Sequence, residues 1–375
     1  MDNSRIHTLA YPHRILFGPG AMRAGLKQLP SGLKKILIVT GAHAAAGGEL
    51  PAWIREELKG REVFFREGVH PEPTPMEVNE IMNIGRDAAV EAVIALGGGS
   101  VIDAAKAAAA LIPAEGDCSE YFSGERVIPG KGLFFAAFPT TAGTGAEMTS
   151  NSVLTDPETL VKKSLRSPFM TADLAGIDPD LTLSCPPAQT AASGLDAFVQ
   201  AVESYTSLNA TCATRPLAAE AVKKIFMNIQ GACRHPDNLD FRWEMAEGSM
   251  LSALSFSQSG LGAVHGLAHP LGSLLQVPHG VACAILMPYI FQWNLPTCRK
   301  EYTELARLCG FENRPFPDLV REMADELGIP RNFSGYHLQE KHFDFIIANC
   351  RSNSMSLTPR PMTDRDVRTF LESLC

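Results

Sequence analysis

The sequence Ala92-Val-Ile-Ala-Leu-Gly-Gly-Gly-Ser100 joins a short apolar run to three consecutive glycines. An apolar run of this length that ends at a turn signal is typical of a strand buried on both faces. The Ala-rich segment after Ser100 predicts a helix, so the glycines connect a strand directly to a helix. This connection is the basic unit of a parallel sheet covered by helices.

The same alternation of strand and helix continues on both sides of this stretch. Further strands are predicted at Lys35–Thr40, Glu62–Arg66 and Leu133–Phe138, and helices near Pro51–Lys59 and Thr74–Ala89. Continuous apolar strands that alternate with helices indicate an α/β fold with a mainly parallel, Rossmann-like sheet.

The pattern changes near residues 180–186, where strand signals nearly vanish. Proline-containing breaks then separate long amphipathic or apolar segments. These segments predict helices over Pro187–Ser207, Thr211–Ala232, Asp240–Ser257, Gly262–Leu275 and Ala282–Trp293. We therefore predict two domains: an α/β domain over residues 1–184 and an all-helical (all-α) domain over residues 185–375.

Length and charge agree with a two-domain globular enzyme. The chain has 375 residues, of which 45% are hydrophobic and 20% charged, and its formal net charge is −8. A nucleic-acid-binding face would need a cluster of basic residues, and no Lys/Arg run is longer than a pair. The start of the chain has no apolar secretion signal, and no segment approaches the length of a membrane span. We expect a cytoplasmic protein that binds neither nucleic acid nor membranes.

The 9 cysteines are scattered and form no CxxC pair. This spacing argues against a disulfide framework and against a zinc site built from thiolates. Each cysteine is interpreted as a buried small apolar residue in a reducing compartment.

Two loops suggest that the α/β domain binds a dinucleotide. Glycines at Gly97–Gly99 allow a ligand close to the backbone, and the N–H groups of the following helix favour a pyrophosphate. This is not the GxGxxG fingerprint, and three glycines alone are equally typical of a tight turn. However, Thr140-Thr-Ala-Gly-Thr-Gly145 follows another strand in the same way. Because open α/β sheets bind ligands beyond the carboxyl ends of their strands, the two loops together favour a dinucleotide.

The end of the strand at Lys35–Thr40 bears on the choice between NAD and NADP. An acidic residue here would bind the adenosine ribose and repel a 2′-phosphate, but the chain has Gly41. The small residues Ala44–Gly48 leave further room. No Arg or Lys stands beside Gly41 to hold a phosphate, so the sequence leaves both cofactors open.

The helical domain contains a cluster of metal-binding residue types. Of the 10 histidines, His265, His269 and His279 fall in one short stretch, and Asp196 and Gln200 lie four residues apart upstream. A single histidine or aspartate in such helices is more often a satisfied core or helix-end residue. Several of them in apolar helices need partners, and imidazoles with a carboxylate suit Fe²⁺ or Zn²⁺.

With these residues, the chain resembles the iron-containing (group III) alcohol dehydrogenase family. That family includes lactaldehyde/propanediol oxidoreductases and is similar to glycerol dehydrogenase, maleylacetate reductase and dehydroquinate synthase. The resemblance covers nearly the whole chain. It is carried by Gly97-Gly-Gly-Ser100…Asp103…Lys106, Pro139-Thr-Thr-Ala-Gly-Thr-Gly-Ala-Glu147, Gly194-Leu-Asp-Ala197…Glu203 and His265-Gly-Leu-Ala-His-Pro-Leu-Gly272…Pro278-His-Gly280.

The resemblance implies roles for individual residues. Asp196, His265 and His279 match metal ligands, and Gln200 occupies the fourth ligand position, where the family usually has histidine. His269 matches a histidine near the nicotinamide and is the candidate catalytic proton relay. The resemblance further implies a site in the cleft between the domains, a substrate contact at Phe256, and cofactor contacts at Gly97, Gly98, Gly99, Ser100, Asp103, Thr140, Thr141, Thr144, Thr149 and Lys162.

The function implied is a metal-dependent alcohol dehydrogenase or aldehyde reductase that transfers a hydride between NAD(P) and a small alcohol or aldehyde. Fe²⁺ is the expected metal, with Zn²⁺ as the alternative, and a homodimer is the expected assembly. Because of Gln200, a maleylacetate-reductase-like enzyme with little or no metal is a competing hypothesis. A dehydroquinate-synthase-like cyclase and a non-catalytic nucleotide-binding protein are more distant ones.

Overall fold

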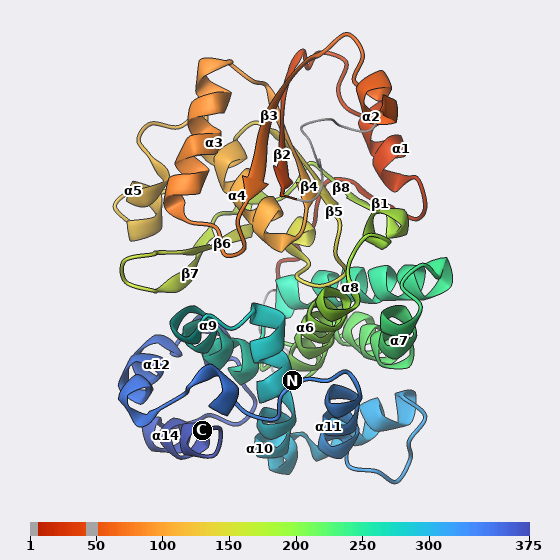
Figure 1. Ribbon diagram of the computed structural model, residues 1–375, viewed down its shortest axis with the longest axis vertical. Coiled ribbons are helices and arrows are strands. Elements are labelled where there is room, and N and C mark those ends of the chain that lie inside the picture. Colours follow the sequence, from red (N-terminus) through yellow and green to blue (C-terminus); the bar gives the residue numbers. More distant parts are fainter. Residues whose placement is uncertain (1–6, 43–51) are drawn as a thin grey trace. The chain divides into compact units, whose positions relative to one another are not determined.

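The computed structural model describes residues 7–42 and 52–375. The chain divides into two compact units. We call Ala10–Ser184 the sheet unit, and Cys185–Cys375 together with residues 7–9 the helical unit. Figure 1 shows the strands in the first unit and the long helices in the second.

The sheet unit is built on a six-stranded sheet in the order β1-β8-β5-β4-β2-β3, in which every neighbouring pair is parallel. An antiparallel pair, β6 with β7, forms a separate small sheet. The strands are β1 (Ile15–Phe17), β2 (Lys35–Gly41), β3 (Glu62–Val69), β4 (Ala92–Gly97), β5 (Phe134–Pro139), β6 (Asn151–Thr155), β7 (Lys162–Arg166) and β8 (Leu174–Ile177).

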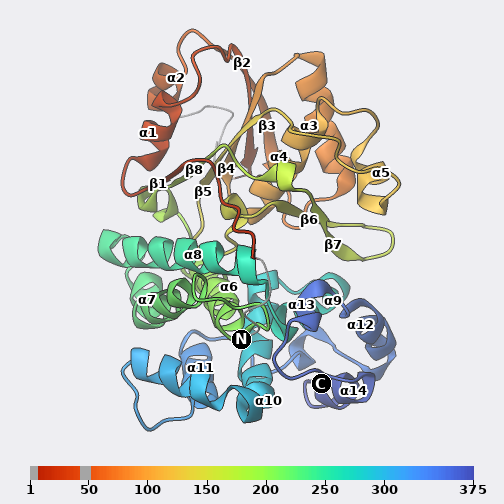
Figure 2. The same ribbon diagram turned by 180° about the vertical axis from the view of Figure 1, so that it is seen from behind.

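Helices cover both faces of the six-stranded sheet, as Figures 1 and 2 show from opposite sides. Alternate strand residues such as Leu37 and Val93 pack with α3 and α4, whereas Ile38 and Ile94 pack with α1 and α2. Each buried Val, Leu or Ile contributes roughly 1.5–3 kcal/mol. Since both faces are buried, the strands are apolar throughout rather than alternating. The helices are α1 (Ala21–Lys27), α2 (Ala52–Glu57), α3 (Pro75–Asp87), α4 (Gly99–Leu111) and α5 (Cys118–Ser123).

Local signals in the sequence explain where the helices of this unit begin. The Thr74 hydroxyl accepts from the Glu77 backbone N–H at 3.2 Å, and the Glu77 carboxylate accepts from the Thr74 N–H at 3.2 Å. This reciprocal capping box starts α3. Helix α4 starts directly after Gly98, which is extended, so the glycines end β4 and begin the helix within three residues.

The α/β architecture predicted from the sequence is confirmed, but two strands of the main sheet were missed. With three and four residues, β1 and β8 are too short to give a periodic signal. Strand β7 was missed because its sequence, Lys-Lys-Ser-Leu-Arg, is mostly polar. In addition, Gly41 is the last residue of β2, so this strand is one residue longer than predicted.

The helical unit is all-α over its described residues. Helices α6, α7 and α8 pack against one another, and α10 packs against α6, α9 and α11. Smaller helices, α12 and α13, pack on α9, and α14 packs on α12. The helices are α6 (Pro187–Thr206), α7 (Arg215–Arg234), α8 (Leu239–Ser259), α9 (Ala263–Leu275), α10 (His279–Leu308), α11 (Phe316–Glu326), α12 (Phe343–Asn349), α13 (Asn353–Ser356) and α14 (Asp364–Glu372).

The boundaries of α10 differ from the prediction of Ala282–Trp293. The helix begins at His279, immediately after Pro278, and continues to Leu308 across a kink at Cys298. Pro288 and Pro296 lie inside it. The early start matters because it places His279 in the first turn of a helix rather than in a loop.

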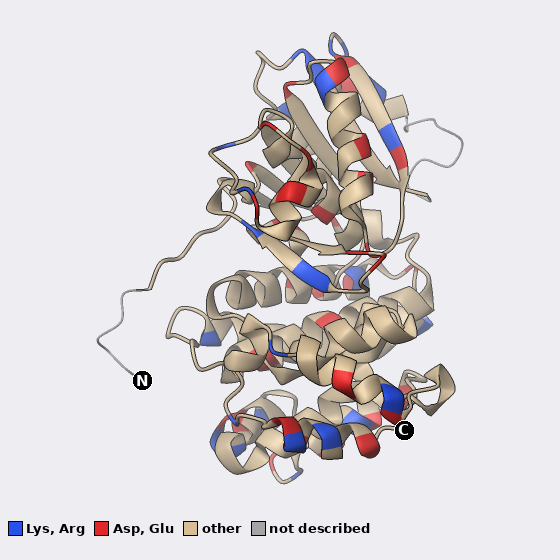
Figure 3. Ribbon diagram, turned by 90° about the vertical axis from the view of Figure 1, so that its left-hand side faces the viewer, with Lys and Arg blue, Asp and Glu red and all other residues tan. Residues whose placement is uncertain are grey.

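Charges are mixed on both units: Figure 3 shows acidic and basic residues interspersed along their helices and strands. Among the described residues, no helix combines the length and apolar character that crossing a membrane requires.

Candidate functional site

Three helices of the helical unit each present two side chains four residues apart. Residues at this spacing lie on one face of a helix. The pairs are Asp196 and Gln200 in α6, His265 and His269 in α9, and His279 and Cys283 in α10. Because α10 packs against both α6 and α9, these three faces can meet at one point.

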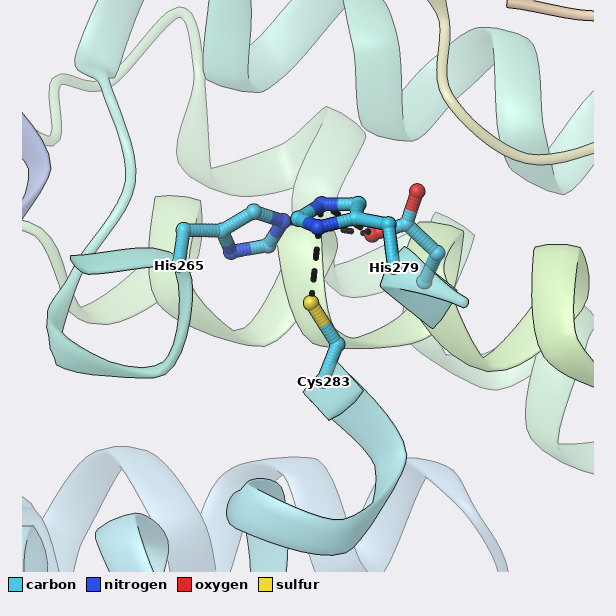
Figure 4. Close-up of side chains that lie close together, drawn as sticks. His265, His279 and Cys283 are labelled. Carbon is cyan, nitrogen blue, oxygen red and sulfur yellow. Dashed lines mark hydrogen bonds and ion pairs between the residues drawn. The ribbon is translucent and has the colours of Figure 1, made fainter. Parts of the chain in front are cut away.

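Four of these side chains form a compact cluster of donor atoms. One atom each of Asp196, His265, His279 and Cys283 lies within 4.8 Å of all the others. Asp196 Oδ1 is 3.2 Å from His265 Nε2 and 3.7 Å from His279 Nε2, and Cys283 Sγ is 3.7 Å from His279 Nε2. Figure 4 shows the His265 and His279 rings pointing toward each other and the Cys283 sulfur pointing at the His279 ring.

The orientation of His265 is set by a second carboxylate, Glu203, one turn beyond Gln200 in α6. Its Oε2 accepts a hydrogen bond from His265 Nδ1 at 2.6 Å, and its Oε1 accepts from the Val264 backbone N–H at 2.6 Å. Glu203, His265 and Asp196 thus form a connected series, and all three are at least 96% buried. A carboxylate only accepts, so Nδ1 carries the proton and a neutral His265 turns the Nε2 lone pair toward Asp196.

Two acceptors, Asp196 Oδ1 and His265 Nε2, therefore face each other at 3.2 Å in a buried place. Such an arrangement is stable only with a cation beside both atoms, which is either a proton on Nε2 or a metal ion. Burial alone disfavours a charged imidazole, but the nearby Cys283 sulfur and the hydrogen bonds to Asp196 and Glu203 outweigh burial and hold the pKa of His265 well above its ordinary value. The site is thus arranged to attract positive charge.

Gln200 gives an independent sign of a missing partner. Its side-chain carbonyl Oε1 is buried and has no hydrogen-bond partner among the described residues. An orphaned buried carbonyl costs about 1–3 kcal/mol. Together with one carboxylate and two imidazoles, it makes a donor set that fits a divalent ion such as Fe²⁺ or Zn²⁺.

His269, the other histidine of α9, borders the same cluster. Its ring centroid lies 5.3 Å from that of His279, and it is half-buried. A histidine that is partly open to solvent can accept and release protons near neutral pH. Phe256, the predicted substrate contact, is half-buried on α8.

In the sheet unit, the two predicted cofactor loops meet. A Cβ atom added to Gly99 would come within 2.5 Å of the Thr144 side chain, and one added to Gly98 would lie 3.7 Å from Thr141. The Thr140 N–H donates to the Gly97 carbonyl at 3.0 Å. Glycine is therefore required at Gly99 for the close approach of the threonine loop, and both loops lie at the N-terminus of α4, which attracts anions.

Behind these loops lies a buried ammonium, which the sequence analysis did not single out as a site residue. Lys106 Nζ donates to the carbonyls of Ala146, Thr149 and Asn151 at 2.5–3.0 Å and to the Thr149 hydroxyl at 2.9 Å. Asp103 lies 3.8 Å away. Burial lowers the pKa of Lys106 to about 8, and nearby Asp103 opposes this shift. Two predicted cofactor residues, Asp103 and Thr149, thus hold the shape of the loop.

Other predicted cofactor positions also have internal contacts. Lys162 Nζ is 2.6 Å from the Glu72 carboxylate, and the Ser100 hydroxyl accepts from the Glu72 backbone N–H at 3.2 Å. Glu72 itself adopts a left-handed backbone conformation with φ of 58°. Gly41 is partly exposed at the end of β2, whereas Ala44–Gly48 lies outside the described residues.

The chain matches two family models. Residues 12–179 match the family described as iron-containing alcohol dehydrogenase, and residues 190–375 match its C-terminal domain. The chain therefore belongs to the iron-containing alcohol dehydrogenase family, and it is an oxidoreductase of the alcohol dehydrogenase class.

Individual relatives cover almost the whole chain. Long-chain-alcohol dehydrogenase 1 of Geobacillus thermodenitrificans is 33% identical, covering 91% of this chain and 90% of its own. The 1,3-propanediol dehydrogenase of Klebsiella pneumoniae is 32% identical, with 91% and 92% covered. The solved structure of sulfoacetaldehyde reductase from Bifidobacterium kashiwanohense with NAD⁺ is 29% identical, has a TM-score of 0.91 and covers 99% of both chains. The family and enzyme class predicted from the sequence are confirmed.

Sequence reasoning assigned no role to two residues beside the predicted metal ligands. Glu203 follows Asp196 by seven residues and Cys283 follows His279 by four, so helical spacing could have revealed both. Interpreting every cysteine as buried was wrong for Cys212 and Cys375, which are exposed, and Cys233 is only partly buried.

Proposed function

We propose that this chain interconverts small alcohols and aldehydes with a nicotinamide cofactor, at a divalent metal ion held by Asp196, His265 and His279. Gln200 offers a neutral carbonyl oxygen on the same face of α6 as Asp196. The observation that carries this proposal is the pair of buried acceptors, Asp196 Oδ1 and His265 Nε2, facing each other at 3.2 Å.

Each residue of the site has a separate role in the proposed reaction. When bound, the metal supplies a Lewis acid for the substrate oxygen, and nicotinamide accepts or donates the hydride. Glu203 fixes the Nδ1–H tautomer of His265, as carboxylates do for metal-binding histidines. Asp196, Glu203 and His265 are themselves at most 4% exposed, so little water screens their charges. His269 carries the alcohol proton to or from solvent, and Phe256 lines the substrate pocket.

For the cofactor, we propose that the loops at Gly97–Ser100 and Thr140–Thr144 bind the pyrophosphate at the start of α4. Thr149, held by Lys106, and Lys162 complete the binding surface, and Asp103 holds it in shape from within. Gly41 presents no carboxylate that would repel a 2′-phosphate. We therefore expect the enzyme to use both NADH and NADPH as cofactors. Measuring kcat/KM with each cofactor tests this expectation.

We also propose a cytoplasmic homodimer. All nine cysteines are free and most are buried, which suits a reducing compartment. Strand β3 is an edge of the sheet, and its Phe65 is 38% exposed, so a second copy would cover an otherwise open surface. Light scattering after size-exclusion chromatography measures the assembly.

The deciding experiment combines metal analysis with a substrate panel. Protein with quantified bound metal is assayed on alcohols and aldehydes with both cofactors, and Asp196→Ala is compared with Asp318→Ala, an exposed residue of α11. Asp196→Ala should lose the metal and at least ~10³-fold in kcat/KM, because a Lewis acid contributes several kcal/mol. Asp318→Ala should retain both.

Turnover that survives complete metal removal would contradict the metal-dependent mechanism. It would instead support a metal-free reductase of the maleylacetate type, the alternative that Gln200 leaves open.

A further inference from the structure

Of the four residues in the cluster, Cys283 is the one that the sequence did not predict as a metal ligand. It is fully buried in the second turn of α10, four residues after His279. Its sulfur lies 3.7 Å from His279 Nε2 and within 4.8 Å of the donor atoms of Asp196 and His265. In Figure 4 the sulfur is directed at the His279 ring rather than into the surrounding helices.

Three of the six separations between these atoms are close to those of a tetrahedral zinc site. Donors bound to Zn²⁺ at their usual distances lie about 3.3–3.8 Å from one another. The separations of Asp196 from His265 (3.2 Å), of Asp196 from His279 (3.7 Å) and of His279 from Cys283 (3.7 Å) already fall close to this range. The remaining pairs, at no more than 4.8 Å, need only a small contraction around an ion.

Charge and chemistry favour Cys283 over Gln200 as the fourth ligand. An amide carbonyl is a neutral and weak donor, whereas a thiolate is anionic and binds Zn²⁺ strongly. A thiolate and the Asp196 carboxylate would together neutralise a divalent cation in a buried place. Gln200 would then be free to accept a hydrogen bond from water or substrate.

We propose that Cys283 is a metal ligand, so that the ion is held by Asp196, His265, His279 and the Cys283 thiolate, and that this set favours Zn²⁺ over Fe²⁺. This inference rests on the metal site of the proposed function. As the ion binds, the S–H bond breaks, a sulfur–metal bond forms and the proton leaves to solvent. Soft thiolate donors shift the preference of a mixed site from iron toward zinc.

Cobalt titration of the metal-free full chain tests the proposal directly. Co²⁺ accepts the same ligands as Zn²⁺, and a thiolate bound to it gives intense near-ultraviolet charge-transfer absorption that oxygen and nitrogen ligands lack. We expect this band to grow to one Co²⁺ per chain and to disappear when Zn²⁺ is added. This measurement needs only the wild-type protein. Its outcome therefore does not depend on whether a variant folds.

Two variants locate the sulfur. Cys283→Ser should lose the band and bind Zn²⁺ at least ~100-fold more weakly, since loss of a ligand exceeds the 10- to 100-fold effect of losing a supporting residue. Cys298→Ser, at the buried cysteine further along α10, should keep the band and the affinity.

The outcomes separate this proposal from the proposed function. Stoichiometric Co²⁺ binding without the band, or a band that persists in Cys283→Ser, overturns the role of Cys283 and leaves the metal site intact. Absence of any metal binding by the wild-type chain overturns both. Equal or tighter binding of Fe²⁺ in competition with Zn²⁺ overturns the predicted preference.

Discussion

Glu203 contacts the proposed metal ligand His265 and the backbone beside it. Its two carboxylate oxygens accept from His265 Nδ1 and from the Val264 N–H, both at 2.6 Å. One residue thus fixes both the ring and the backbone that carries it. We therefore regard Glu203 as a positioning residue whose charge makes His265 a better donor.

Replacing Glu203 by glutamine tests this role. Glu203→Gln keeps the size of the side chain but removes its charge, so the affinity for Zn²⁺ should fall by about 10- to 100-fold while the fold is retained. Competition with a chelator measures the affinity for Zn²⁺, and circular dichroism checks that the variant is folded. Glu220→Gln on the surface of α7 is the control, and an unchanged affinity in Glu203→Gln would contradict the role.

Glu147, in the sheet unit, is a second residue whose protonation depends on its burial. It lies buried beside Lys106 and Asp103 in the short 3₁₀ turn at Ala146–Met148, and burial raises the pKa of its carboxyl from 4.5 to about 7. Below pH 4.5 both folded and unfolded chains hold this proton. Between pH 4.5 and 7 only the folded chain keeps it, so this stabilising contribution is lost as the pH rises.

Glu147→Gln should remove this pH dependence. Compared with the wild type, the variant should be equally stable near pH 4.5 and more stable at pH 8, by up to about 3 kcal/mol. Urea denaturation of both proteins at the two pH values measures the difference. A variant that is less stable than the wild type at pH 8 would show instead that Glu147 is ionised and paired with Lys106.

At the scale of elements, the site depends on how closely α10 approaches α6. A Cβ atom on Gly280, in the first turn of α10, would lie 2.2 Å from the backbone carbonyl oxygen of Ala192 in α6. Backbone atoms cannot move aside as a flexible side chain can. Glycine at this position therefore allows His279 to reach Asp196.

Gly280→Ala should push the two helices apart. We expect a loss of about 1–3 kcal/mol in stability and a weaker affinity for metal, because His279 and Asp196 separate. Gly335→Ala, where an added Cβ meets nothing within 4 Å, is the matched control. Thermal unfolding and zinc titration measure both effects, and an unchanged zinc affinity in Gly280→Ala would show that the close approach is not needed.

At the scale of the whole molecule, the two kinds of ligand belong to different units. The proposed metal donors lie between residues 196 and 283 of the helical unit, whereas the proposed cofactor loops lie in the sheet unit. Each ligand should therefore stabilise the unit that binds it, independently of the other.

Thermal shifts test this separation. A ligand at about 100 times its Kd adds about 2.7 kcal/mol, which corresponds to a rise of roughly 5–10 °C in Tm. Zn²⁺ and NAD⁺ should each give such a rise in the wild type. Asp196→Ala should lose the response to Zn²⁺ and keep the response to NAD⁺; loss of both responses would show that the two sites are not independent.

Local patterns in the sequence predicted much of the fold. Apolar runs such as Lys35–Thr40 and Ala92–Leu96 form strands because burial on both faces selects apolar residues at every position. The glycines at Gly97–Gly99 end a strand and start a helix for local steric reasons. Helical spacing also grouped Asp196 with Gln200 and His265 with His269.

Long-range packing decided what these local patterns left open. No local signal places the short strand β8 between β1 and β5, since that pairing depends on the register of distant strands. Likewise, Cys283 lies beside Asp196 and Glu203 reaches His265 only because α6, α9 and α10 pack together, although Asp196 and Cys283 are 87 residues apart along the chain (283 − 196). Sequence spacing shows which side chains share a helix face, but helix packing decides which faces meet.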